Sequence, residues 1–74
     1  MTIQPDLHIS IETEREDDGR WIAEVPELPG VLTYGATRHE AMTKAEILAL
    51  RVLADQLEHS ETGPTPITIS VAAE

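Results

Sequence analysis

The stretch from Gly19 to Gly35 constrains the fold most, because prolines and glycines interrupt it at fixed places. Pro26 and Pro29 hold the backbone φ angle at about −65° and remove two N–H donors, so a β-ladder cannot continue through them. Gly30 and Gly35 permit backbone conformations or close approaches that other residues resist. The stretch therefore predicts a strand, a proline corner and a second strand, in that order.

The remaining strands are predicted from alternation of apolar and polar residues. Ile9 and Ile11 alternate with polar neighbours, and Trp21, Ala23 and Val25 share one face of the next strand. We expect four strands, over residues 7–13, 20–25, 31–36 and 66–72. Asp18-Gly19 ends an acidic turn between the first two, and this pair favours a hairpin. The turn lacks the ligand spacing of a calcium loop, so a solvated hairpin tip is the better interpretation.

A long helix is predicted to follow the third strand. Thr37 and Glu40 stand at the spacing of a capping box, and neither Pro nor Gly occurs from Arg38 to Glu58. The apolar face that would lie on the sheet comprises Ala41, Met42, Ala45, Leu48, Ala49, Val52 and Leu53. With strand four beside strand one after a right-handed crossover, the chain becomes a two-layer α+β domain of order β-β-β-α-β and sheet order 3-2-1-4.

A second apolar strip is offset from this core face. It consists of Ile47, Leu50, Ala54 and Leu57. A helix over a single sheet needs only one apolar stripe, so the strip is either tolerated exposure or a subunit contact. We favour the contact, and therefore expect a homo-oligomer, either a dimer or a tetramer.

The charge balance excludes some classes of function. The chain has 74 residues and a net charge of −9, with 14 acidic and 5 basic residues. Direct nucleic-acid binding requires clustered Lys and Arg, so it is not expected. The acidity indicates either simple solubility or steering toward a basic partner. There is no cysteine, no apolar run that could span a membrane and no signal-peptide pattern, so we expect a cytoplasmic protein.

One stretch resembles a known family. Asp18-Gly19, the run from Trp21 to Gly30, Gly35-Ala36-Thr37 and Glu40-Ala41 resemble the signature of the HicB-like antitoxin domain of bacterial toxin–antitoxin pairs. The resemblance implies a truncated ribonuclease-H-like fold. It also implies binding of a small basic HicA-like toxin, an RNA-cleaving protein whose catalytic His and RNA surface would be masked. Family members often add a C-terminal DNA-binding domain; here we expect a single domain over residues 1–74 without one.

The sequence is compatible with three classes of function: an enzyme, a protein-binding inhibitor and a solitary binding domain. An enzyme is disfavoured, since no inward carboxylates or Ser–His–Asp set can be recognised, and no metal or cofactor is expected. We favour an antitoxin-like inhibitor that binds the toxin through exposed carboxylates, namely Glu12, Asp17, Asp18, Glu24 and Glu27. The alternative is a solitary oligomeric binding or adaptor domain without a toxin and without catalysis.

Overall fold

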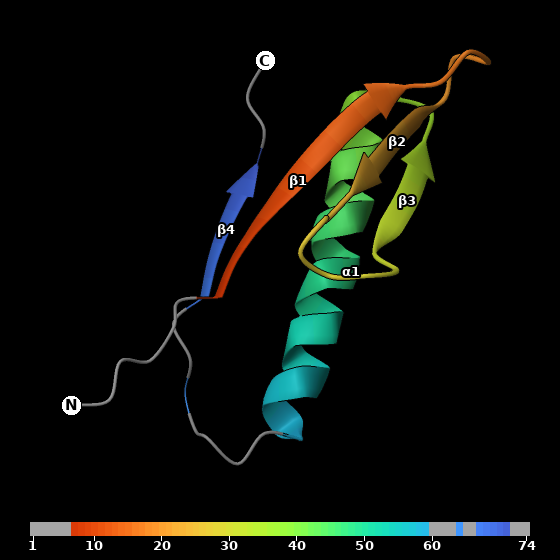
Figure 1. Ribbon diagram of the computed structural model, residues 1–74. Coiled ribbons are helices and arrows are strands. Elements are labelled where there is room, and N and C mark those ends of the chain that lie inside the picture. The colour runs from red at the N-terminus through yellow and green to blue at the C-terminus, as the bar shows by residue number, and fades with distance from the viewer. Residues whose placement is uncertain (1–6, 60–63, 65–66, 72–74) are drawn as a thin grey trace.

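The computed structural model describes residues 7–59, 64 and 67–71. Figure 1 shows four strands and one helix, in the order β1 (Leu7–Arg15), β2 (Trp21–Glu24), β3 (Leu32–Gly35), α1 (Arg38–Glu58) and β4 (Ile67–Val71). The strands form one sheet of order β3-β2-β1-β4. β1 is antiparallel to β2 and parallel to β4, and β2 is antiparallel to β3. The predicted α+β fold class, element order and sheet order are confirmed.

Three strands differ from the prediction at their boundaries. β2 is Trp21–Glu24, one residue shorter at each end than the predicted 20–25, and β3 ends at Gly35 instead of residue 36. β1 continues to Arg15 instead of ending at residue 13, because Glu14 and Arg15 pair with Ile22 and Trp21 across the hairpin. β3 begins at Leu32, because the Val31 N–H turns back to the Leu28 carbonyl within the proline corner (3.1 Å). The two ends predicted for the last strand, residues 66 and 72, lie outside the described residues.

The hairpin between β1 and β2 closes as a tight loop. The Gly19 N–H donates to the Glu16 carbonyl (2.9 Å), and the Glu16 N–H donates to the Arg20 carbonyl (2.7 Å). Gly19 has a φ of 92°, a left-handed conformation that glycine adopts without a steric penalty. The Asp-Gly signal in the sequence therefore marks the position where the chain reverses.

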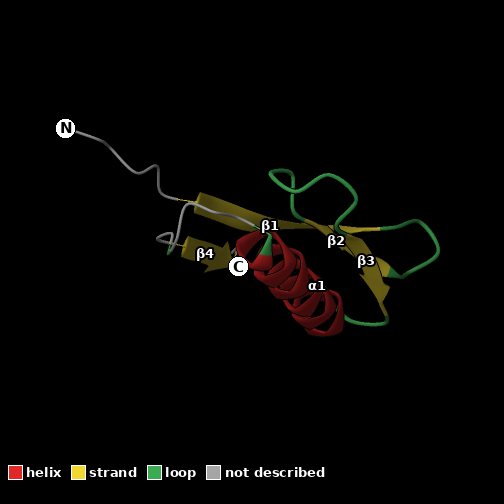
Figure 2. Ribbon diagram, turned by 90° about the horizontal axis from the view of Figure 1, so that it is seen from below, coloured by secondary structure: helices red, strands yellow, loops and turns green. Residues whose placement is uncertain are grey.

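Helix α1 packs on one face of the sheet, against β3, β2 and β1 (Figure 2). Its first turn is capped by Thr37, whose Oγ1 accepts from the Glu40 N–H (3.0 Å). The Glu40 carboxylate reaches back to the Ala36 N–H (2.6 Å), one residue before the N-cap position of a standard capping box. The predicted helix start is confirmed, and two otherwise unpaired N–H groups at this end have acceptors.

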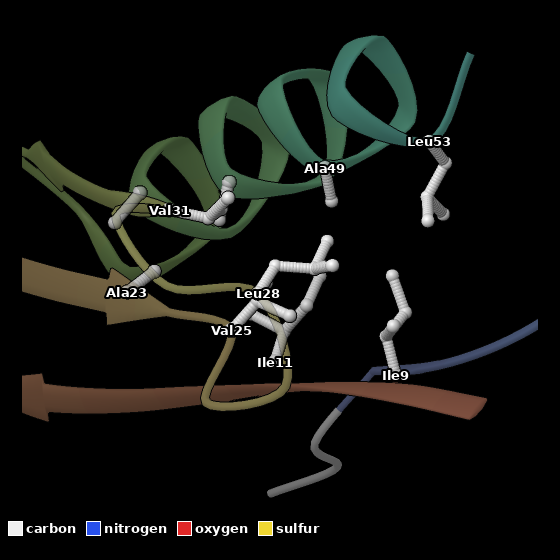
Figure 3. Close-up of a cluster of buried hydrophobic side chains, with 10 residues drawn as sticks. Ile9, Ile11, Ala23, Val25, Leu28, Val31, Ala49 and Leu53 are labelled. Atoms are coloured by element: carbon white, nitrogen blue, oxygen red, sulfur yellow. The ribbon is translucent and has the colours of Figure 1, made fainter. Parts of the chain in front are cut away.

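The core lies between α1 and the sheet (Figure 3). Ala41, Ala45 and Ala49 form a completely buried row of small residues on the helix, and Ala23 faces them from β2 with no exposed surface. Small side chains on both surfaces allow the two layers to approach closely. The larger core residues are Ile9, Ile11, Val25, Leu28, Val31 and Leu53. Leu28 was not predicted: the proline corner folds it inward as part of the core.

Gly35 allows the start of the helix to lie close to β3. A Cβ atom added to Gly35 would lie 2.6 Å from the Ala41 nitrogen, which is backbone and cannot move aside easily. Thr33, two residues earlier, donates from its hydroxyl to the Ala41 carbonyl (2.9 Å). The close approach predicted for Gly35 is thus confirmed, and it fixes the helix relative to the sheet.

Candidate functional site

The face of the sheet opposite α1 is not covered by any described helix or strand (Figure 2). Cross-strand partners project from the same side of a sheet. The register pairs Glu12 with Glu24, and Glu24 with Leu32. It also pairs Glu14 with Ile22, and Ile22 with Tyr34. These pairs place one group of residues on the uncovered side, which we call the acidic sheet face: Glu12, Glu14, Ile22, Glu24, Leu32 and Tyr34.

Two carboxylates of this face oppose each other directly. Glu12 and Glu24 are cross-strand partners, and both side chains are exposed. Neither has an ion-pair partner among the residues that the structure describes. Like charges directly opposite in a sheet are destabilising, so this pair lowers the stability of the isolated domain. A cation supplied from outside would remove that repulsion.

Exposed apolar surface adjoins the carboxylates. Leu32 is 42% exposed and Tyr34 is 41% exposed, while Ile22 between them and β1 is half-buried. A shallow hollow lined by Glu12, Thr13, Glu14, Ile22 and Glu24 lies beside this apolar surface. Aromatic side chains with an apolar body and a polar tip are favoured at protein interfaces. The face therefore combines an apolar area with an acidic border.

Asp17 and Asp18 lie at the hairpin tip, at one end of the acidic sheet face. The Asp18 carboxylate accepts from the Arg20 backbone N–H (3.0 Å) and from the Arg20 guanidinium (2.8 Å). The backbone hydrogen bond, helped by the guanidinium, holds the pKa of Asp18 below its ordinary value of 3.8. The same guanidinium stacks over the Tyr34 ring, 4.7 Å from its centroid. Arg20 thus links the hairpin tip to the apolar part of the face.

Glu27 is engaged within the domain. Its carboxylate accepts from the Ser10 backbone N–H (3.0 Å) and from the Ser10 hydroxyl (2.9 Å). β2 ends at Glu24, so the Glu27 carboxylate supplies β1 with an acceptor beyond the end of that strand. The backbone hydrogen bond from Ser10 holds the pKa of Glu27 below its ordinary value of 4.5. Glu27 is exposed, but its oxygens already have donors.

The outer surface of α1 is the second uncovered area. Ile47 is 45% exposed, Leu50 is 47% exposed and Leu57 is 39% exposed; Ala54 is exposed beside them. These four residues, which we call the helix strip, lie on the side of the helix away from the buried alanines. The exposed strip predicted from the sequence is therefore present.

Within the described residues, no group of three or more His, Asp and Glu side chains could hold a metal ion. His8 is exposed, with its Nε2 atom 3.2 Å from the Ser70 hydroxyl. No helix in this part of the chain has the length and apolar character needed to cross a membrane.

The structure brings together some of the predicted site residues. Glu12 and Glu24 are adjacent and unpaired, whereas Asp18 and Glu27 are held by intramolecular donors. Sequence reasoning missed Leu32 and Tyr34 as part of this face. The alternation of Leu32 and Tyr34 with Thr33 and Gly35 is a signal that could have placed them there, because neighbouring residues of a strand point to opposite faces of the sheet.

No family model, no curated protein and no solved structure matches this chain.

Proposed function

We propose that this chain is a non-catalytic, antitoxin-like inhibitor that binds a small basic protein through its acidic sheet face. The observation that carries this role is the unpaired Glu12–Glu24 pair beside exposed Leu32 and Tyr34. Repulsion between the two carboxylates costs stability in the free domain. Arg or Lys side chains from a partner would neutralise it, while an apolar side chain of the partner covers Leu32 and Tyr34.

The partner's chemistry follows from the charge of the whole chain. A net charge of −9 attracts a basic protein over long range and repels nucleic acid. A protein that cleaves RNA needs a basic surface to hold the phosphates. An acidic sheet face can compete with RNA for that surface, which is the action expected of a HicB-like antitoxin on a HicA-like toxin. Both proteins would then act in the cytoplasm, where the RNA substrate is found.

The resemblance to HicB-like antitoxins supports this proposal from the sequence side. The residues that carry it include the Asp18-Gly19 hairpin and the Thr37 helix cap. Each occupies a structural position that the fold requires, so the motif describes the scaffold on which the acidic sheet face is built. The identity of the partner rests on the charge and on the exposed residues of the face.

Affinity capture tests this function. The tagged chain is captured from its own cells at low salt and eluted with increasing salt, and the eluted proteins are identified by mass spectrometry. We expect one small basic protein, released by salt, whose RNA cleavage is then inhibited by the purified chain. Recovery of only the chain itself would contradict the inhibitor role and favour the solitary oligomeric binding domain.

A further inference from the structure

We propose that the helix strip binds a second copy of this chain, with the two α1 helices packed antiparallel. The strip has the spacing of a coiled-coil seam. Ile47, Leu50, Ala54 and Leu57 follow one another at intervals of three, four and three residues. Apolar residues at these intervals keep one seam facing a partner helix. All four side chains are exposed in the single chain, so the seam is free to receive another helix.

The distribution of charge favours a second copy at this surface. Helix α1 carries three basic residues, Arg38, Lys44 and Arg51, against four acidic ones, and so has a net charge of −1. The whole chain carries −9, so the residues outside the helix carry −8. Two copies that approach through their helices bring together surfaces of small net charge. An approach through their sheet faces would bring together the most acidic parts.

The flanking charges specify the direction of packing. Lys44, Arg51 and Glu58 are seven residues apart and lie along one edge of the strip. In an antiparallel pair such edges face each other, so Lys44 of one copy lies opposite Glu58 of the other, twice by symmetry, and the two Arg51 side chains meet near the two-fold axis. The two Lys44–Glu58 pairs outnumber this single like-charge pair. Ile47 then meets Leu57, and Leu50 meets Ala54. Antiparallel packing also sets each helix dipole against the opposite end of its neighbour.

The arrangement has a consequence for the acidic sheet face. Each sheet lies on the far side of its own helix, so two copies joined through the helices form four layers, sheet–helix–helix–sheet. The two acidic faces then point away from each other, which keeps their repulsion small and leaves both open. Such a dimer presents two identical binding faces, and each can hold its own partner.

Sedimentation over a range of concentrations tests the dimer. We expect the wild-type chain to reach twice its mass of 8.1 kDa as concentration rises. The variant L50Q/L57Q should stay at the single-chain mass with an unchanged circular dichroism spectrum. The matched control L32Q removes an equally exposed leucine from the sheet face and should dimerise normally. A wild type that remains monomeric, or an L50Q/L57Q variant that still dimerises, would overturn the proposal.

A charge exchange tests the direction of packing. K44E and E58K each turn two attractive pairs into repulsive ones, so each should weaken dimerisation about tenfold. The double variant K44E/E58K restores opposite charges between the copies and should dimerise more tightly than either single variant, although it still lacks the contacts of Lys44 with Glu40 (3.9 Å) and the Tyr34 carbonyl (3.3 Å). If only overall charge mattered, E58K would strengthen dimerisation by making the chain less negative. That result, or a double variant as weak as the single ones, would overturn the antiparallel arrangement.

Discussion

The two uncovered surfaces of this domain differ in their charge and in how much apolar surface they expose. On the acidic sheet face, Glu12 and Glu24 oppose each other without a cation, and the apolar residues beside them are few. On the helix strip the exposed residues are apolar, and the strip lies on an element with a net charge of only −1. A surface that repels itself suits an oppositely charged partner, whereas a nearly neutral apolar strip suits a second copy. The difference assigns the two surfaces to different partners.

The largest expected effect is on the packing of the helix against the sheet, which both surfaces depend on. In Gly35→Ala the new Cβ would lie 2.6 Å from the Ala41 nitrogen, so the helix must shift on the sheet. We expect a loss of about 2–3 kcal/mol in the free energy of unfolding, the upper range for overpacking. Urea unfolding followed by Trp21 fluorescence measures it.

Gly19→Ala is the comparison for that variant. Gly19 has a φ of 92°, but nothing lies within 4 Å of an added Cβ. Only the backbone penalty applies there, about 1–2 kcal/mol, and the helix remains in place. Equal losses in the two variants would mean that the contact between Gly35 and the helix is not what holds the layers together.

Added salt should weaken partner binding at the acidic sheet face and strengthen dimerisation at the helix strip. Raising the salt concentration from about 0.1 M to about 1 M shortens the Debye length from about 10 Å to about 3 Å. Binding of a basic protein to the sheet face should weaken about tenfold or more, because its attraction is screened. Dimerisation through the helices should strengthen, because the screened repulsion between two chains of net charge −9 outweighs the screened attraction of the exposed Lys44–Glu58 pairs. Sedimentation at both salt concentrations measures both effects; dimerisation that falls with salt would mean that opposite charges, and not the apolar helix strip, hold the two copies together.

A smaller effect concerns stability. Glu12→Gln removes one of two like charges that face each other across β1 and β2. We expect the free energy of unfolding to rise by about 0.2–1 kcal/mol, even though the candidate site has lost a charge. The control Glu46→Gln removes a charge from the helix, where no acidic residue stands three or four positions from Glu46. A destabilised Glu12→Gln variant would mean that the carboxylate makes a favourable contact in the free domain.

The smallest effect is on the pH dependence of stability. The Ser10 backbone N–H lowers the pKa of Glu27 below 4.5, so the folded state favours the charged carboxylate. This contribution is fully present above about pH 4.5 and is lost as the pH falls through the lower, folded-state pKa. Glu27→Gln should flatten the acid side of the stability curve. Ser10→Ala, which keeps the backbone donor, should change it less; equal curves for wild type and Glu27→Gln would contradict the role of this bond.

The fold was largely predictable because its signals are local and agree with each other. The proline corner, the Thr37 cap and the alternation around Ile9 and Ile11 each specify one element, and the short connections fix the antiparallel order. The inward turn of Leu28 was not predictable in this way. It depends on backbone hydrogen bonds between Val25, Leu28 and Val31, which no local sequence pattern indicates.

The candidate site was predictable only in part. Exposure of Glu12 and Glu24 follows from strand alternation, but their direct opposition depends on the register between β1 and β2. The hydrogen bonds of Glu27 join residues 17 positions apart, and no local pattern indicates them. Leu32 and Tyr34 join the face because the register of β3 pairs them with Glu24 and Ile22.

The most direct test of the sheet face is a side-by-side capture from cells with two matched variants. E12Q/E24Q removes two charges from the sheet face, and E46Q/D55N removes two charges from the helix. We predict that the wild type and E46Q/D55N capture the same small basic protein, and that E12Q/E24Q loses it although it is folded. Equal capture by all three chains, or a loss shared by both variants, would contradict a binding site on the acidic sheet face.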